Sequence, residues 1–108
     1  MSEFVKIAQV DRLHRLRGTL VAVNGEDIVL FRRGSDVFAL SNVCAHQHFS
    51  KLHDGSVTDT EVTCPMHGWT YDIRTGGATS GQGKVRSFPV RVLGNDVFIA
   101  VGEEGNEE

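Results

Sequence analysis

The sequence stretch that decides the fold is Cys44-Ala45-His46, followed after seventeen residues by Cys64-Pro65-Met66-His67-Gly68-Trp69-Thr70-Tyr71-Asp72. Each of these two motifs holds one cysteine and one histidine at short spacing, and together they use both cysteines of the protein. Thiolate sulfur and imidazole nitrogen are both common ligands of transition metals. The pattern therefore predicts a metal centre to which two separate loops contribute one sulfur and one nitrogen each.

The donor set favours an iron–sulfur centre over a zinc site. Two cysteines are too few for an all-cysteine cluster, but a binuclear cluster can be held by two cysteines on one iron and two histidines on the other. Two cysteines and two histidines can also form a tetrahedral zinc site. Zinc modules, however, typically pair cysteine with cysteine and histidine with histidine at close spacing. We therefore expect a [2Fe–2S] cluster, one per chain.

At these residues the chain resembles the Rieske family, whose signature is Cys-x-His, a spacer of about this length, and Cys-x-x-His. The resemblance covers most of the chain. It implies that Cys44 and Cys64 bind one iron, while His46 and His67 bind the other iron at the exposed tip. It also implies an all-β fold, a Rieske-type antiparallel β-sandwich with an inserted cluster-binding subdomain.

The remaining sequence is typical of an all-β protein, because short alternating segments are separated by turns. Asn24-Gly25 is a strong hairpin turn, since both residues tolerate positive φ, and Gly94-Asn95 predicts a closing hairpin. Strands are expected at 4–8, 19–23, 27–31, 37–40, 61–63, 69–73, 85–92 and 97–101. Residues 11–16 predict at most one helical turn.

The length of 108 residues predicts one small domain, residues 1–108, which would gain stability from a bound metal. We expect a base formed by about 1–41 and 84–104, with a cluster-binding part inserted at about 42–83.

The resemblance implies a one-electron carrier, the ferredoxin component of a ring-hydroxylating oxygenase system, rather than an enzyme. Its partners would be a flavin-containing, NAD(P)H-dependent ferredoxin reductase and a terminal oxygenase. The alternative within the same fold is the small subunit of a cytoplasmic nitrite reductase, although many of those subunits lack the ligands. The Rieske domain of an oxygenase large subunit is a further alternative, but it would need a second, mononuclear iron domain, for which 108 residues leave no room.

Departures from the respiratory-type Rieske pattern predict a low reduction potential. Those proteins carry an extra, disulfide-bonded cysteine in each ligand loop and a serine at the position of Trp69, whose hydroxyl bonds a cluster sulfide. Such hydrogen bonds stabilise the reduced cluster, so their loss lowers the potential. Tyr71 is retained, and its hydroxyl is expected to reach a cysteine sulfur. We expect a value near the lower end of the roughly −150 to +300 mV Rieske range.

Several neighbours of the motifs have predicted roles. Gly68, without a Cβ, would let backbone N–H groups approach the cluster sulfides. Phe49, Pro65 and Met66 would form a small apolar docking patch beside the histidine ligands. Trp69 would either join that patch or pack under the loop as core.

The other histidines and two nearby acids are not expected to bind metal. His48 does not fit the Cys-x-His spacing, His53 is expected to be a surface or supporting residue, and His14 lies far from the motifs. Asp54 and Asp72 are expected to pair with a neighbouring cation or to cap a turn.

Charge and hydropathy exclude several classes of function. The net charge is −3, with four glutamates among residues 102–108 and no basic stripe, so nucleic-acid binding is disfavoured. Residues 1–6 have no basic segment followed by an apolar run, so we expect no secretory signal, and no apolar run approaches the length of a membrane span. Because both cysteines are assigned to the metal, we expect a cytoplasmic location.

Overall fold

The structure is a computed structural model, and it describes residues 3–14, 17–23, 25–43, 52–65, 68–80 and 83–101. The strands are β1 (Glu3–Gln9), β2 (Thr19–Val23), β3 (Glu26–Arg33), β4 (Asp36–Ser41), β5 (Ser56–Val57), β6 (Glu61–Thr63), β7 (Thr70–Asp72), β8 (Ala78–Ser80), β9 (Ser87–Phe88), β10 (Val90–Leu93) and β11 (Asp96–Val101). The helices of this part are two short 3-10 turns, η1 (Val10–Arg12) and η2 (Leu52–Asp54). Neither turn has the length or apolar character that crossing a membrane requires.

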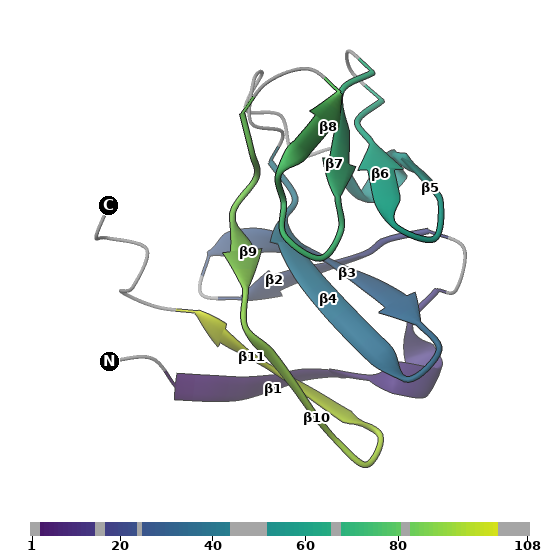
Figure 1. Cartoon of the computed structure of the whole chain (residues 1–108). Coiled ribbons are helices and arrows are strands. Elements are labelled where there is room, and N and C mark those ends of the chain that lie inside the picture. Colours follow the sequence, from purple (N-terminus) through teal and green to yellow (C-terminus); the bar gives the residue numbers. More distant parts are fainter. Residues whose placement is uncertain are drawn as a thin grey trace.

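The strands form three antiparallel sheets, which confirms the predicted all-β class. The sheet orders are β1-β11-β10, β2-β3-β4-β9 and β5-β6-β7-β8. Figure 1 shows the small β5–β8 sheet stacked at one end of the molecule, above the β2–β4 sheet, with the β1-β11-β10 sheet at the opposite end. The small sheet is the inserted subdomain of the predicted fold, while the proposed limits at residues 42 and 83 stay a prediction.

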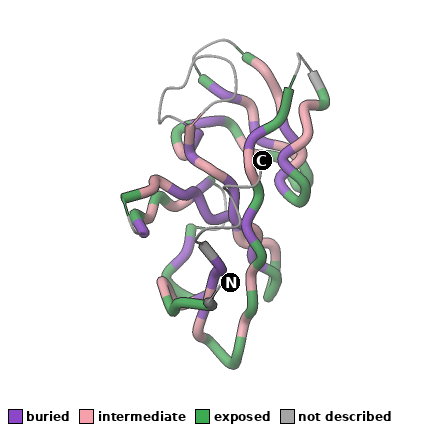
Figure 2. Tube along the Cα trace, turned by 90° about the vertical axis from the view of Figure 1, so that its left-hand side faces the viewer, coloured by how far each residue is buried: buried purple, intermediate pink, exposed green. Residues whose placement is uncertain are grey.

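The β2-β3-β4-β9 sheet is the central layer, and side chains are buried on both of its faces. Ile28, Val29, Leu30 and Phe31 of β3 are consecutive, and all are fully buried. Because side chains alternate along a strand, Ile28 and Leu30 face one core while Val29 and Phe31 face another. A strand covered on both faces reads as a continuous apolar run. Figure 2 shows the buried residues running through the interior between the sheets.

We name the two cores by their positions. The base core contains Val10, Leu13, Val23, Ile28, Leu30, Val37, Ala39, Phe88, Val97 and Ile99. The cluster-side core contains Val29, Phe31, Leu40, Leu52, Val62, Cys64, Tyr71, Ile73 and Val85. The second core joins the small sheet to the central one, so the cluster-binding part is anchored on a layer that the base also uses.

The two predicted hairpins are confirmed, and the glycine in each turn explains why the chain reverses there. Gly25 and Gly94 have φ values of 79° and 64°, which place both in the left-handed region that glycine adopts without steric cost. They connect β2 to β3 and β10 to β11, which pair in register on both sides of the turns.

The expected strand at 85–92 is wrong, because Pro89 divides it. Ser87–Phe88 pairs with β4, whereas Val90–Leu93 pairs with β11. Proline has no backbone N–H to continue a ladder, while the Pro89 carbonyl accepts a hydrogen bond from Ala100 (3.1 Å). One segment thus passes from the central sheet to the base sheet.

Smaller differences concern short elements. The helical turn expected at 11–16 is a 3-10 turn at Val10–Arg12, and the strand expected at 69–73 is limited to Thr70–Asp72. The strands Ser56–Val57 and Ala78–Ser80 were not predicted. They have two and three residues, too few for a period to emerge from the sequence.

Candidate metal centre

The second ligand motif forms the tip of the β6–β7 hairpin. Thr63 pairs with Thr70, and the Cys64 N–H then donates to the Trp69 carbonyl (2.8 Å). The Gly68 N–H donates to the Cys64 carbonyl (2.9 Å), which closes the loop on itself. Residues 64 and 68 are therefore fixed by backbone hydrogen bonds on the two sides of the predicted ligand His67.

Gly68 is required for its backbone conformation. Its φ is 76°, a value that side chains with a Cβ rarely adopt. Its own N–H donates to the Cys64 carbonyl. The glycine therefore shapes the loop, and the close approach of backbone N–H groups to the sulfides stays a prediction.

Cys64 lies at the inner end of this loop and is fully buried. It belongs to the cluster-side core together with Leu52, Val62 and Tyr71. A metal-binding cysteine acts as the thiolate, so cluster formation requires Cys64 in its reduced form.

The other three predicted ligands, Cys44, His46 and His67, lie outside the described residues, as do Phe49 and Met66 of the predicted docking patch. Within the ranges that the structure describes, no group of three or more His, Cys, Asp or Glu side chains is close enough to hold a metal ion. The assignment of the ligand set therefore stays a prediction, and Cys64 is the member whose surroundings are seen.

The aromatic residues that follow the motif pack inward. Tyr71 is fully buried on β7, in the same core as Cys64. Trp69 is half-buried and packs against that core, so of its two predicted positions the structure supports the one under the loop. Below them, the hydroxyls of Thr63 and Thr70 lie 3.0 Å apart and bridge the two strands that carry the loop.

The turn after β7 is fixed by Asp72, as predicted. Its Oδ1 accepts the Arg74 N–H (2.8 Å), and the Arg74 guanidinium Nε lies 3.4 Å from the same oxygen. The backbone hydrogen bond, followed by the Arg74 side chain, lowers the pKa of Asp72 below its ordinary value, because both favour the charged carboxylate. Asp54 Oδ1 lies 3.6 Å from His53 Nε2, beside a ring that is a cation only when both nitrogens are protonated, so the cation pairing expected of Asp54 stays a prediction.

Asn42, which was not predicted as a functional residue, lies two residues before Cys44 and is fully buried. No periodicity or motif marks an asparagine at the end of a strand as a core residue. Its backbone and side chain bond the segment that follows the first ligand loop. His53 takes part in these contacts, whereas the exposed His14 bonds Thr19 through its backbone N–H only.

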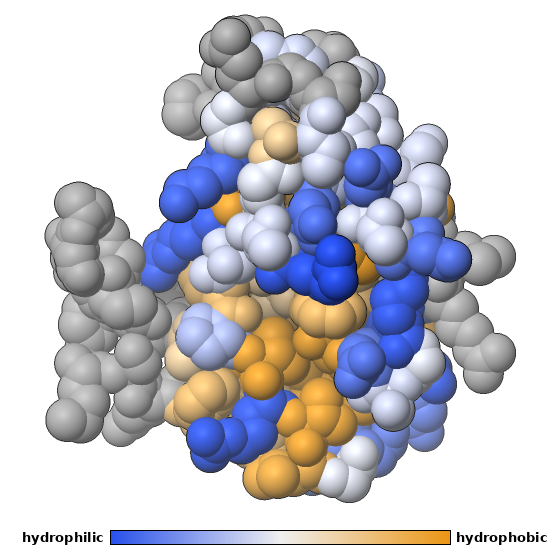
Figure 3. Space-filling model, viewed as in Figure 1, coloured by the Kyte–Doolittle hydropathy of each residue, from blue (hydrophilic) through white to orange (hydrophobic). Residues whose placement is uncertain are grey.

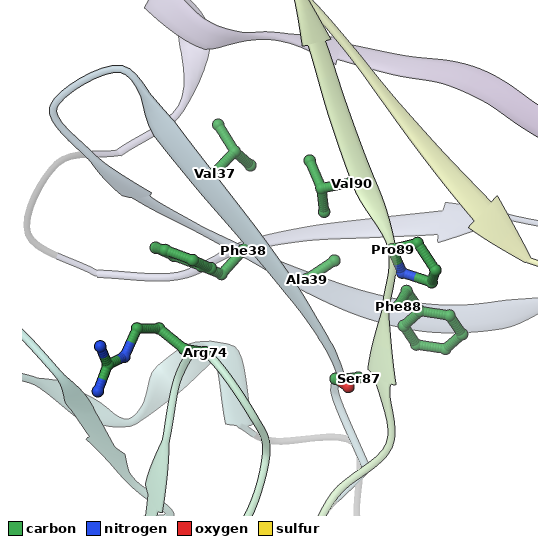
Figure 4. Close-up of a pocket in the computed structure, with 8 residues that line it drawn as sticks. All are labelled: Val37, Phe38, Ala39, Arg74, Ser87, Phe88, Pro89 and Val90. Atoms are coloured by element: carbon green, nitrogen blue, oxygen red, sulfur yellow. The ribbon is translucent and has the colours of Figure 1, made fainter.

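The described surface has a shallow groove beside β4. One groove of about 440 Å³ lies where β4 meets the β9–β10 segment, lined by Val37, Phe38, Ala39, Arg74, Ser87, Phe88, Pro89 and Val90. Figure 4 shows Val37 and Ala39 of β4 on the side of Val90 and Pro89, while Phe38 points away from them and Arg74 is set apart at the edge. In Figure 3 apolar surface gathers in the lower half of this face, over the central sheet and the β1-β11-β10 sheet, while the surface of the small sheet is more polar. This groove has no acid or base pair among its described lining.

The described surroundings of Cys64 fit a [2Fe–2S] group. A cysteine held in a closed hairpin loop, with apolar core behind it and a histidine three residues later in the sequence, is a suitable donor for a cluster bound at a loop tip. Similarity to known proteins supports the same group. A family model described as the Rieske [2Fe-2S] domain matches residues 3–90.

The chain is also similar to individual proteins over most of its length. The ferredoxin subunit of anthranilate 1,2-dioxygenase from Burkholderia cepacia is 30% identical over 104 residues, which cover 94% of this chain and 95% of that protein. The solved ferredoxin of carbazole 1,9a-dioxygenase from Nocardioides aromaticivorans IC177 is 31% identical with a TM-score of 0.83, over 89% of this chain and 95% of that one.

Nitrite reductase subunits share the fold at lower identity. A structure assigned to an NADH-dependent nitrite reductase small subunit from Mycobacterium tuberculosis has a TM-score of 0.85 and 21% identity, over 95% of this chain and 98% of that one. That likeness shows the fold alone. With a family match across 3–90 and a dioxygenase ferredoxin related over nearly its whole length, this chain belongs to the Rieske [2Fe–2S] family, among the ferredoxin components of dioxygenase systems.

Proposed function

We propose that this protein carries single electrons on one [2Fe–2S] cluster, with Cys44 and Cys64 on one iron and His46 and His67 on the other. The observation that carries the proposal is the 30% identity to a dioxygenase ferredoxin subunit over 95% of that relative, combined with a complete set of Cys and His ligands. The cluster, when bound, supplies a site that accepts and returns one electron.

The residues of the chain hold and insulate that site. The buried environment of Cys64 keeps water from the inner side of the loop, and the closed 64–69 loop fixes the backbone on both sides of His67. The imidazoles donate less charge than thiolates and raise the potential, whereas Trp69 in place of a serine removes one hydrogen bond and lowers it. We expect a potential near the low end of the Rieske range, and a midpoint above about +100 mV would contradict this.

The partners we propose are a flavin-containing, NAD(P)H-dependent reductase as donor and a terminal oxygenase as acceptor. Both similar ferredoxins are named as parts of dioxygenases, which supports a place between these two components. The chain itself is an electron-transfer component and not an enzyme. Because the ligand cysteines must be thiolates, we place the protein in a reducing, cytoplasmic compartment.

The test is low-temperature EPR of the dithionite-reduced protein. We expect a binuclear signal whose average g lies clearly below that of an all-cysteine cluster, because two imidazoles replace two thiolates. A silent spectrum from a colourless protein would point to zinc or to no metal, and the electron-carrier proposal would fall.

Two variants locate the nitrogen ligands. His46→Ala should abolish the mixed-ligand signal, whereas His48→Ala, two residues further along, should retain it and serves as the matched control. The reverse result would transfer the ligand assignment to His48.

A further inference from the structure

Asn42 connects the two ends of the first ligand loop through its backbone. Its N–H donates to the Asp27 carbonyl on β3 (2.9 Å), and its own carbonyl accepts the Leu52 N–H (3.1 Å). Asn42 precedes the Cys44–His46 motif, and Leu52 is the first residue described after it. The segment between them thus leaves from and returns to one point on the central sheet.

The side chain of Asn42 adds two contacts to His53. The Asn42 Oδ1 accepts the His53 backbone N–H (2.6 Å), and the Asn42 Nδ2 lies 2.9 Å from His53 Nδ1. Because a backbone N–H can only donate, the amide orientation is fixed and Nδ2 is the donor toward the imidazole. His53 Nδ1 must then accept, so the ring proton is on Nε2, which faces Asp54 Oδ1 at 3.6 Å.

Burial makes this contact expensive to lose. Asn42 is the one buried polar residue among those described, and its side chain is fully enclosed. A buried amide donor that loses its acceptor carries the full desolvation cost of the group. The His53 ring therefore satisfies a donor that water does not reach.

The same segment contacts the strand that leads to Cys64. Gly55 donates its N–H to the Leu52 carbonyl (2.9 Å) and lies against the backbone of Thr63, where a Cβ at residue 55 would overlap the Thr63 carbonyl. Thr63 directly precedes Cys64. A continuous path of contacts thus runs from the start of the first ligand loop to the start of the second.

We infer that Asn42 and His53 are positioning residues for the cluster: their paired hydrogen bonds close the base of the first ligand loop and set its placement relative to the Cys64 loop. The inference deepens the proposed function and rests on it. Neither residue is expected to bind iron; both would act through the backbone that carries Cys44 and His46.

The test compares His53→Leu with His53→Asn in the cluster-containing protein. Leucine removes the acceptor, while the Asn Oδ1 can occupy the place of the imidazole Nδ1 and keep it. For His53→Leu we expect amide hydrogen exchange over residues 43–53 to become about tenfold faster, the effect of one lost hydrogen bond to a buried donor. We also expect faster iron release to a chelator, altered g values and a shifted midpoint potential. His53→Asn should restore all of these toward wild type.

Ile99→Val is the matched control for general loss of stability. Ile99 is fully buried in the base core, away from the Asn42–His53 hydrogen bonds. Its variant should therefore lower the melting temperature without changing the potential or the g values. Wild-type exchange and potential in His53→Leu would overturn the inference, as would His53→Asn behaving like His53→Leu. If the wild-type protein lacks the mixed-ligand EPR signal, the proposed function fails instead. The hydrogen-exchange rates of His53→Leu and wild type still report on the Asn42–His53 hydrogen bonds in that case.

Discussion

Leu30 and Leu40 allow the two faces of the central sheet to be tested separately. Both are fully buried leucines on paired strands, but Leu30 lies in the base core and Leu40 in the cluster-side core with Cys64. Truncating either to alanine removes the same atoms. We expect the two variants to lose similar global stability but to differ in how well they keep the metal.

The magnitude follows from cavity formation in a packed core. A buried Leu→Ala change costs about 2–5 kcal/mol, and about 3 kcal/mol corresponds to a fall of roughly 12–24 °C in Tm for a domain near this size. If iron is released through local opening of the small sheet, the same 3 kcal/mol in the cluster-side core accelerates release about 100-fold. The Leu30→Ala cavity lies on the other face, so it should change release far less.

The assay combines thermal melting by circular dichroism with bleaching of the cluster absorbance by an iron chelator at a temperature well below both transitions. We expect similar melting temperatures and much faster bleaching for Leu40→Ala. Equal bleaching in the two variants would show that iron leaves only through global unfolding. That result would refute the argument that the cluster-side core is a separate support of the metal loops.

Three further outcomes are expected. Gly76→Ala should lower the free energy of unfolding by about 1–3 kcal/mol, because φ at Gly76 is +82° and the new Cβ would overlap a backbone carbonyl. Gly77→Ala is the control, since its Cβ would meet only ordinary contact and should change the free energy of unfolding little. Equal melting temperatures of the two variants would contradict this. Asp72→Asn should remove the stabilisation that the charged carboxylate gives. That stabilisation is fully present above the ordinary pKa of 3.8 and disappears as the pH falls through the lower pKa that Asp72 has in the folded state, because of Arg74. Denaturant titrations of wild type and Asp72→Asn should therefore differ at neutral pH and converge in acid. His67→Cys should change the absorption spectrum and lower the midpoint potential, since a third thiolate adds negative charge to the cluster; an unchanged spectrum would remove His67 from the ligand set.

Features that depend on neighbours in the chain were predictable. The turn at Gly25 requires a positive φ, so the sequence predicts that hairpin and its register without knowledge of the rest of the fold. The same holds for the two Cys/His motifs, because donor type and spacing are properties of a few consecutive residues. These short-range features sufficed for the fold class and the kind of metal centre.

Features that depend on partners distant in the sequence could not be predicted. The expected strand at 85–92 divides at Pro89 because its first half pairs with β4, which lies far upstream in the sequence, while its second half pairs with β11 across the closing hairpin. The positive φ of Gly68 was not predicted, because it depends on the closing of the 64–69 loop by backbone hydrogen bonds. The sequence gives no sign of the role of Asn42, since its partners are Asp27, fifteen residues upstream, and His53, across the ligand loop.

The sequence by itself indicated the kind of metal centre, because two cysteines and two histidines in paired motifs are typical of a mixed-ligand [2Fe–2S] cluster. It also determined the all-β class, through period-two alternation and glycine turns. The tertiary structure alone decided what supports the centre: a central sheet buried on both faces, and an asparagine whose donors and acceptors are satisfied across a loop. Burial and long-range hydrogen bonding are properties of the assembled molecule, since they exist only after segments distant in the chain have packed together.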